Sequence, residues 1–105
     1  MSELRVVLCT FPDAAVARQI GTVLVEKQYA ACLNLLPAVE SIYLWKSKVE
    51  AGSETLAIIK TSAARLGELE AELTRLHPYE VPEFVALEPS HISESYAKWV
   101  LESVG

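Results

Sequence analysis

The sequence has little positive charge, and this shortage excludes whole classes of partner. Only nine of the 105 residues are Lys or Arg, against 14 Asp and Glu, which gives a net charge of −5. The densest positive stretch is Lys46-Ser47-Lys48. Because binding to a phosphate backbone relies on clustered Lys and Arg, we expect no nucleic acid as a partner. An anionic membrane surface is disfavoured for the same reason.

Signals for membrane insertion and secretion are also missing. The uncharged stretch over residues 29–39 is too short to span a bilayer and contains Pro37. The segment Met1-Ser2-Glu3-Leu4-Arg5 has no basic region followed by a long apolar run. The only cysteines, Cys9 and Cys32, do not suggest a secreted disulfide scaffold. We therefore expect a cytoplasmic protein with reduced thiols.

Apolar residues, in contrast, are abundant. They make up 51% of the chain, although a domain of this size has much surface for its volume and needs polar residues to cover it. The length fits one domain over residues 1–105, and the composition excludes disorder of the whole chain. Either the core is dense, or apolar surface is buried against another chain.

Apolar periodicity predicts four strands and three helices. A bend is expected at Pro37, and Pro78 ends the second helix because the residue before a proline is pushed out of helical geometry. The predicted strands cover 4–10, 30–45, 49–61 and 83–87, and the predicted helices cover 13–28, 62–77 and a segment beginning at 93.

This order of elements is the split βαβ arrangement of ferredoxin-like domains, with one added C-terminal helix. The predicted fold class is therefore α+β, a βαββαβ sandwich with an antiparallel sheet. The first two helices should cover one face of the sheet. The other face, to which we assign Cys9, Tyr43 and Trp45, must find other cover or water.

The sequence contains no established catalytic pattern. A phosphate-binding loop, a dinucleotide fingerprint and a Gly-x-Ser-x-Gly motif are all absent. Cys9 and His77 are the residue types of a nucleophile and its base, and the same thiol and imidazole suit copper or zinc. Neither Cys-x-x-Cys nor His-x-x-x-His occurs, so the fold must assemble any metal site. Cys9 in a Val-rich strand is also explained as a small core residue.

The segment from Leu76 to Glu83 has the most distinctive composition. It places a histidine, two prolines, a tyrosine and two acids between a predicted helix and a strand. Because proline fixes backbone angles, this loop is rigid, and a rigid loop with convergent polar groups is a binding-site candidate. Alternatively, the first proline ends a helix, Tyr79 packs, and Glu80 and Glu83 are solvated. Lys60 is able to reach an anion or to pair with either acid, an ion pair worth about 0–1 kcal/mol.

Six segments together match one known family over nearly the whole chain. In chain order they are Cys9-Thr10-Phe11-Pro12-Asp13, Ala30-Ala31-Cys32-Leu33-Asn34, Ser41-Ile42-Tyr43-Leu44-Trp45, Ile58-Ile59-Lys60-Thr61, His77-Pro78-Tyr79-Glu80-Val81-Pro82-Glu83 and Tyr96-x-x-Trp99. The sequence thereby resembles the CutA divalent-cation tolerance proteins, and the run that begins at His77 is the most specific match. One departure is Ser47, where many relatives have glycine in a hairpin turn.

The resemblance implies a tight, PII-like homotrimer in which the long second and third strands pair between subunits. It also implies a non-enzymatic role in the tolerance of copper and other divalent cations. The family's proposed copper ligands correspond here to Cys9 and His77. We further expect Glu80 or Glu83 to hydrogen-bond to these ligands and orient them. Some relatives have a histidine where this chain has Leu76, so we expect weak Cu²⁺ binding and no other cofactor.

Two other functions are compatible with parts of the sequence. The PII-like shape also suggests a signalling trimer that binds a small-molecule effector in an intersubunit cleft. The residues predicted to line that cleft are Tyr43, Trp45, Lys60, Tyr79 and Glu80. An acylphosphatase-like hydrolase would need an Arg in an anion-binding loop and an Asn that positions water, but Arg5 and Asn34 lie in predicted strands. Divalent-cation tolerance is therefore the primary expectation.

Overall fold

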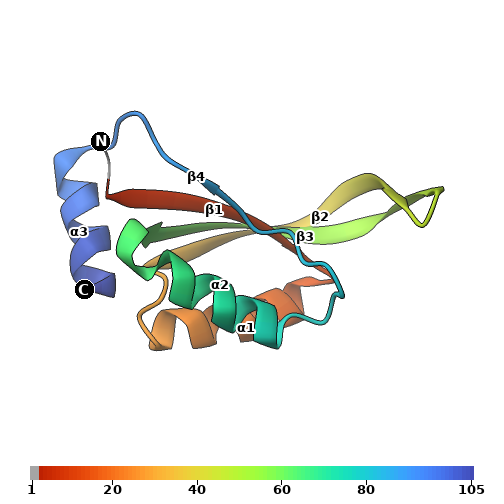
Figure 1. The fold of residues 1–105 in the computed structure, drawn as a ribbon, viewed down its shortest axis with the longest axis horizontal. Helices are drawn as coiled ribbons and strands as arrows, with labels where there is room; N and C mark the ends of the chain where they lie inside the picture. The colour runs from red at the N-terminus through yellow and green to blue at the C-terminus, as the bar shows by residue number, and fades with distance from the viewer. Residues whose placement is uncertain (1–2) are drawn as a thin grey trace.

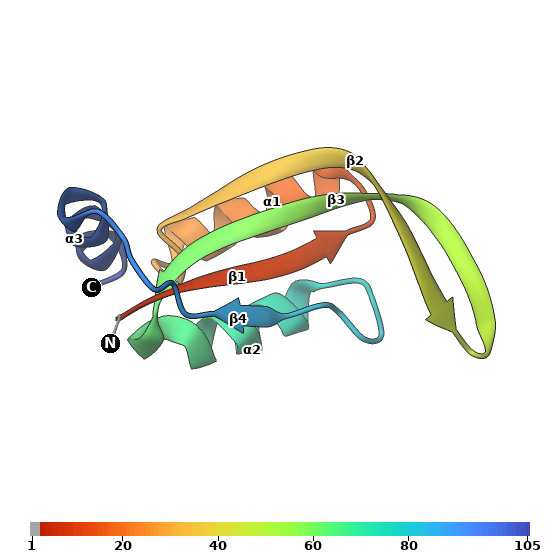
Figure 2. The same cartoon turned by 90° about the horizontal axis from the view of Figure 1, so that it is seen from above.

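The computed structural model describes residues 3–105, which form one antiparallel sheet and three α-helices. The sheet has the strand order β2-β3-β1-β4. Figures 1 and 2 show α1 and α2 on one face of the sheet and α3 at one of its ends. The predicted α+β, ferredoxin-like fold is confirmed. In chain order the elements are β1 (Leu4–Phe11), α1 (Ala14–Glu26), β2 (Cys32–Trp45), β3 (Lys48–Ser62), a 3₁₀ turn (Ala63–Arg65), α2 (Leu66–Leu76), β4 (Val85–Leu87) and α3 (Glu94–Val104).

Local sequence signals account for the ends of the helices. Asp13 precedes α1, and its Oδ1 accepts a hydrogen bond from the Val16 N–H at 2.8 Å, which satisfies a free donor of the first turn. Helix α2 ends at Leu76, as Pro78 predicts. His77 therefore leaves the helix with an extended backbone, φ −71° and ψ 136°, and its side chain points back toward the core.

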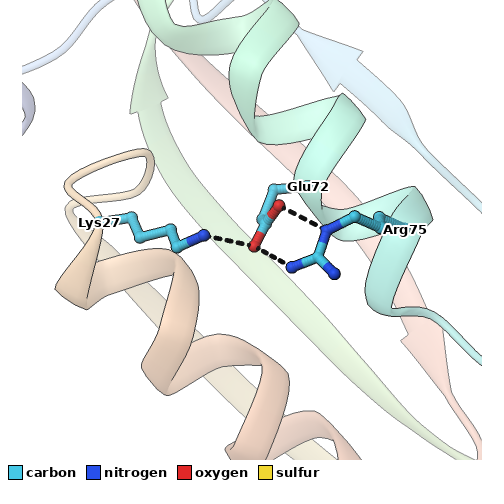
Figure 3. Close-up of polar contacts among 3 residues, drawn as sticks. All are labelled: Lys27, Glu72 and Arg75. Carbon is cyan, nitrogen blue, oxygen red and sulfur yellow. Dashed lines mark hydrogen bonds and ion pairs between the residues drawn. The ribbon is translucent and has the colours of Figure 1, made fainter.

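Glu72 ties α2 to α1, as Figure 3 shows. Lys27 Nζ donates to its Oε2 at 2.8 Å, while Arg75 Nε and Nη2 donate to Oε1 and Oε2 at 3.0 and 2.8 Å. The hydrogen bonds from Arg75 and then Lys27 lower the pKa of Glu72 to about 2. The two helices are thus fixed to each other near the end of α2 from which His77 leaves.

The main core lies between these helices and the sheet. Alternate residues of β1, Val7, Cys9 and Phe11, are buried there beside Ala57 and Ile59 of β3. Cys9 is 0% exposed. Our assignment of Cys9 to the other face of the sheet was wrong, because the two-residue period of the strand places it with Val7 and Phe11 under the helices.

Helices α1 and α2 leave the other face of the sheet open. Its side chains are also apolar, since Leu8 pairs in register with Ile58 of β3 and with Val85 of β4. Val85 and Leu87 remain 46% and 47% exposed. We call this surface the open face; its apolar members are Val6, Leu8, Leu36, Leu56, Ile58, Val85 and Leu87.

Strands β2 and β3 extend beyond the sheet as a two-stranded hairpin (Figure 2). Their pairing continues to Trp45 and Lys48, whereas β1 accompanies β3 only as far as Thr55. A register shift between Leu36 and Val39 confirms the bend predicted at Pro37. We call residues 39–54 the projecting hairpin.

Candidate functional site

A groove of about 850 Å³ is formed by the projecting hairpin and the loop that follows α2. The loop returns from the helix layer to the sheet near the point where the hairpin leaves it (Figure 2). Proline at both ends of the segment 78–82 restricts its backbone. The lining residues are Thr10, Glu40, Ser41, Ile42, Tyr43, Trp45, Glu54 and 78–83.

The groove is acidic. Four glutamates line it, Glu40 and Glu54 from the hairpin and Glu80 and Glu83 from the loop, with no Lys, Arg or His among the lining residues. The negative charge of two of these glutamates also acts on the buried Cys9 of the adjacent core. Burial raises the pKa of the Cys9 thiol to about 12, and the charges of Glu83 and Glu54 add to the increase. Carboxylates concentrated in one cleft attract cations to it.

Tyr79 joins the two walls of the groove. Its hydroxyl donates a hydrogen bond to Glu54 Oε2 at 2.6 Å. Burial raises the pKa of Tyr79, and the bond to Glu54 raises it further because the carboxylate favours the protonated phenol. The bond therefore holds the loop against the hairpin with Tyr79 as donor.

His77 contacts Tyr79 from the core side of the loop and fixes its position. Its Nε2 lies 2.8 Å from the Thr10 carbonyl oxygen, which only accepts, so Nε2 carries the proton and donates. Nδ1 then accepts from the Tyr79 N–H at 3.1 Å. The imidazole stacks on Phe11 at 4.8 Å between centroids and contacts the Tyr79 ring at 4.7 Å. His77 is thus buried with both nitrogens in use.

Cys9 and His77 do not form a ready metal centre within one chain. Both imidazole nitrogens are already hydrogen-bonded, and burial raises the pKa of the Cys9 thiol. A copper ion bound by these two residues would therefore have to displace the thiol proton and one of the imidazole hydrogen bonds. Across residues 3–105, no group of three or more His, Cys, Asp or Glu is placed to hold a metal ion. Copper ligation by these two residues stays a prediction.

The groove brings together most of the residues predicted to bind a ligand. Tyr43, Trp45, Tyr79, Glu80 and Glu83 all line it. Lys60 does not. Its ammonium donates to the side-chain oxygen of Asn34, whereas the sequence left open an anion or an ion pair with Glu80 or Glu83.

Sequence reasoning missed Glu40 and Glu54. Both lie in the projecting hairpin, and Glu54 pairs in register with Val39. Their role depends on which side of the hairpin faces the loop, and no local pattern reports that contact between distant segments. The only available signal was that the predicted loop and hairpin both carried acidic and aromatic residues.

None of the helices described within residues 3–105 has the length and apolar character required to cross a bilayer.

Comparison with known proteins identifies the family. The model of the "CutA1 divalent ion tolerance protein" family matches residues 5–103. The "Divalent-cation tolerance protein CutA" of Thermus thermophilus is 41% identical over 100 residues, covering 95% of this chain and 97% of that protein. "Protein CutA" of Homo sapiens is 43% identical over 91 residues, and the match covers 87% of this chain but only 51% of that protein.

The solved structures agree with the sequence comparison. The crystal structure of CutA from Xylella fastidiosa superposes with a TM-score of 0.96 at 34% identity, covering 99% of this chain and 100% of that one. The matching family model and the Thermus thermophilus relative carry names that refer to divalent-cation tolerance. The chain therefore belongs to the CutA1 divalent ion tolerance protein family.

Proposed function

We propose that this chain acts in the tolerance of divalent cations, as a homotrimer in the cytoplasm. The observation that carries the proposal is the family match over residues 5–103. The chemistry of the molecule supports it, since the net charge is −5 and the projecting hairpin and the loop after α2 form an acidic groove. Both cysteines are free thiols, which suits a reducing compartment.

Exposed apolar surface supports the homotrimer. In the projecting hairpin, Ile42, Leu44 and Val49 are 70%, 71% and 76% exposed. A two-stranded hairpin is marginally stable alone in water, and the open face adds further apolar area beside it. Additional copies arranged by a closed rotation would cover both surfaces and pair the free strand edges.

Growth under metal stress tests the role in tolerance. The gene is deleted in its own host, and growth is followed over a series of Cu²⁺ concentrations, with Mg²⁺ as a cation control. We expect the deletion to lower the Cu²⁺ concentration that stops growth and the wild-type gene to restore it. Equal growth of the two strains at every Cu²⁺ concentration would contradict the proposed function.

Calorimetry with Cu⁺ and Cu²⁺ tests the predicted ligands separately. Wild type is compared with Cys9→Ser and His77→Ala, and His91→Ala serves as the matched histidine control because His91 is exposed. If Cys9 and His77 ligate copper, their variants lose binding heat and the His91 variant does not. Equal heats in all four proteins would remove both residues from the site. Circular dichroism establishes that each variant is folded before titration.

A further inference from the structure

We propose that the groove between the projecting hairpin and the 78–83 loop binds an organic ammonium ion. The ligand class is a small aliphatic amine or quaternary ammonium compound. This inference rests on the groove's own charge and aromatic lining and does not depend on the role in metal tolerance. It concerns the wall residues Tyr43, Trp45 and Tyr79 with Glu80 and Glu83.

Charge selects a cation. The four glutamates that line the groove face no basic lining residue. Glu54 accepts the Tyr79 hydroxyl and keeps the two walls together, while Glu40, Glu80 and Glu83 are exposed. An ammonium group entering here meets carboxylate acceptors on both walls and no competing cation among the lining side chains.

The aromatic rings select an organic cation. Tyr43, Trp45 and Tyr79 line the same groove as the carboxylates, and the faces of such rings attract ammonium groups within about 6 Å of the centroid. The Lys46 ammonium already lies 5.7 Å from the Trp45 ring centroid. An alkylammonium group therefore reaches this indole, and Lys46 is the cation that an incoming ligand has to displace from the ring.

Geometry favours an ammonium ion over a bare metal ion at this place. A metal site needs several ligand atoms converging on one point, and residues 3–105 contain no group of three or more His, Cys, Asp or Glu placed to do so. An ammonium ligand needs only acceptors and ring faces spread around its surface. The volume of about 850 Å³ is also in the range of small-molecule sites.

Fluorescence titration provides the test. Trp45 and Trp99 are the only tryptophans, and Trp99 lies on α3, outside the groove, so a Trp99→Phe background leaves Trp45 as the reporter. Spermidine and tetramethylammonium are the probes, with NaCl matched for ionic strength and MgCl₂ as the metal control. We expect a saturable change in Trp45 emission with at least one amine and none with either salt.

Charge variants decide whether the groove is the site. Glu80→Gln/Glu83→Gln should weaken amine binding about tenfold or more, because hydrogen bonds to charged groups are lost. Glu94→Gln/Glu102→Gln removes the same charge from α3 and should leave the affinity unchanged. Equal weakening in both double variants would show diffuse charge attraction and overturn the proposal.

Three further results would overturn it. One is the absence of saturable binding by either amine at millimolar concentration. Another is saturation by Mg²⁺ at the same affinity as the amine. The third is amine binding that appears only after Lys46→Ala/Lys48→Ala, because the chain's own lysines would then be the occupants of the groove.

Discussion

His77 is held at three points, and none of them needs a metal. Replacing it by Phe keeps a ring against Phe11 but removes the acceptor of the Tyr79 N–H. It also removes one donor to the Thr10 carbonyl, which keeps only the weak contact from the Cys9 thiol at 3.7 Å. We expect His77→Phe to lower the free energy of unfolding by about 1–3 kcal/mol. Urea denaturation measures this loss. The exposed His91 provides the control, and His91→Phe should change stability by less than about 0.5 kcal/mol; equal effects would refute the structural role.

The Cys9 thiol should be unreactive in the folded protein. In a Cys32→Ser background Cys9 is the only thiol, so a disulfide reagent at pH 8 should label it slowly when folded and rapidly in urea.

The pKa of the Cys9 thiol is about 12 in the fold against an ordinary value of 9.0. The unfolded chain therefore loses this proton first, and the stability contributed by the neutral thiol declines as pH rises from 9 to 12. Fast labelling of native protein would contradict this assignment.

Among the structural elements, the pairing of α1 with α2 depends on Glu72. Its pKa is about 2 in the fold against an ordinary 4.5, so its contribution is fully present above pH 4.5 and is lost as pH falls through 2. Glu72→Gln should lower the melting temperature at pH 7 and in low salt, because Lys27 and Arg75 lose their shared acceptor. The difference from wild type should shrink toward pH 2 and in high salt. Glu70→Gln, exposed on the same helix, should not show this pattern.

The hairpin turn carries local backbone strain. Lys46 and Ser47 have φ of 50° and 67°, the left-handed values that a tight two-residue turn requires and that glycine adopts without penalty. We expect Ser47→Gly to raise the free energy of unfolding by up to about 1 kcal/mol. Ser53→Gly, in the extended part of β3, should lower it by about 0.5–1 kcal/mol. Calorimetric melting of both variants checks the opposite signs, and a lower melting temperature for Ser47→Gly would contradict the turn geometry.

The elements themselves were predictable because their signals are local. Alternation, helical spacing and the prolines at 37 and 78 determine the strands, the helices and the ends of several of them. The side of the sheet on which Cys9 lies was not predictable. The strand Leu4–Phe11 carries apolar side chains on both sides, since one side packs under the helices and the other contributes to the open face. Periodicity alone therefore does not say which set of residues contacts the helices. The acidic lining of the groove within one chain was not predictable for a related reason, since the two walls of the groove are distant in sequence.

The high apolar content of the chain, 51% of its residues, is divided between the buried core and exposed parts of the sheet. The main core lies on the side of the sheet that α1 and α2 cover, and a smaller buried cluster at α3 contains Leu4, Ala31, Val100 and Val104. The open face and the projecting hairpin leave large apolar side chains in contact with water. Monomeric proteins rarely expose contiguous apolar surfaces of this kind. The free edge of β2 adds unpaired backbone groups beside them. The isolated chain therefore lacks the cover that its own sheet needs, and further copies would provide it.

The exposed apolar surface predicts a trimer that is required for stability. Light scattering coupled to size exclusion should give about three times the chain mass of 11.5 kDa, and the melting temperature should rise with protein concentration.

Leu8→Glu places a charge at the centre of the open face, between Ile58 and Val85, and should abolish the trimer and leave the chain unfolded or aggregated. Val25→Glu makes the same change at an exposed position of α1 and should leave the mass unchanged. A folded monomer at micromolar concentration, in wild type or in Leu8→Glu, would contradict the account, because it would show that the open face needs no partner.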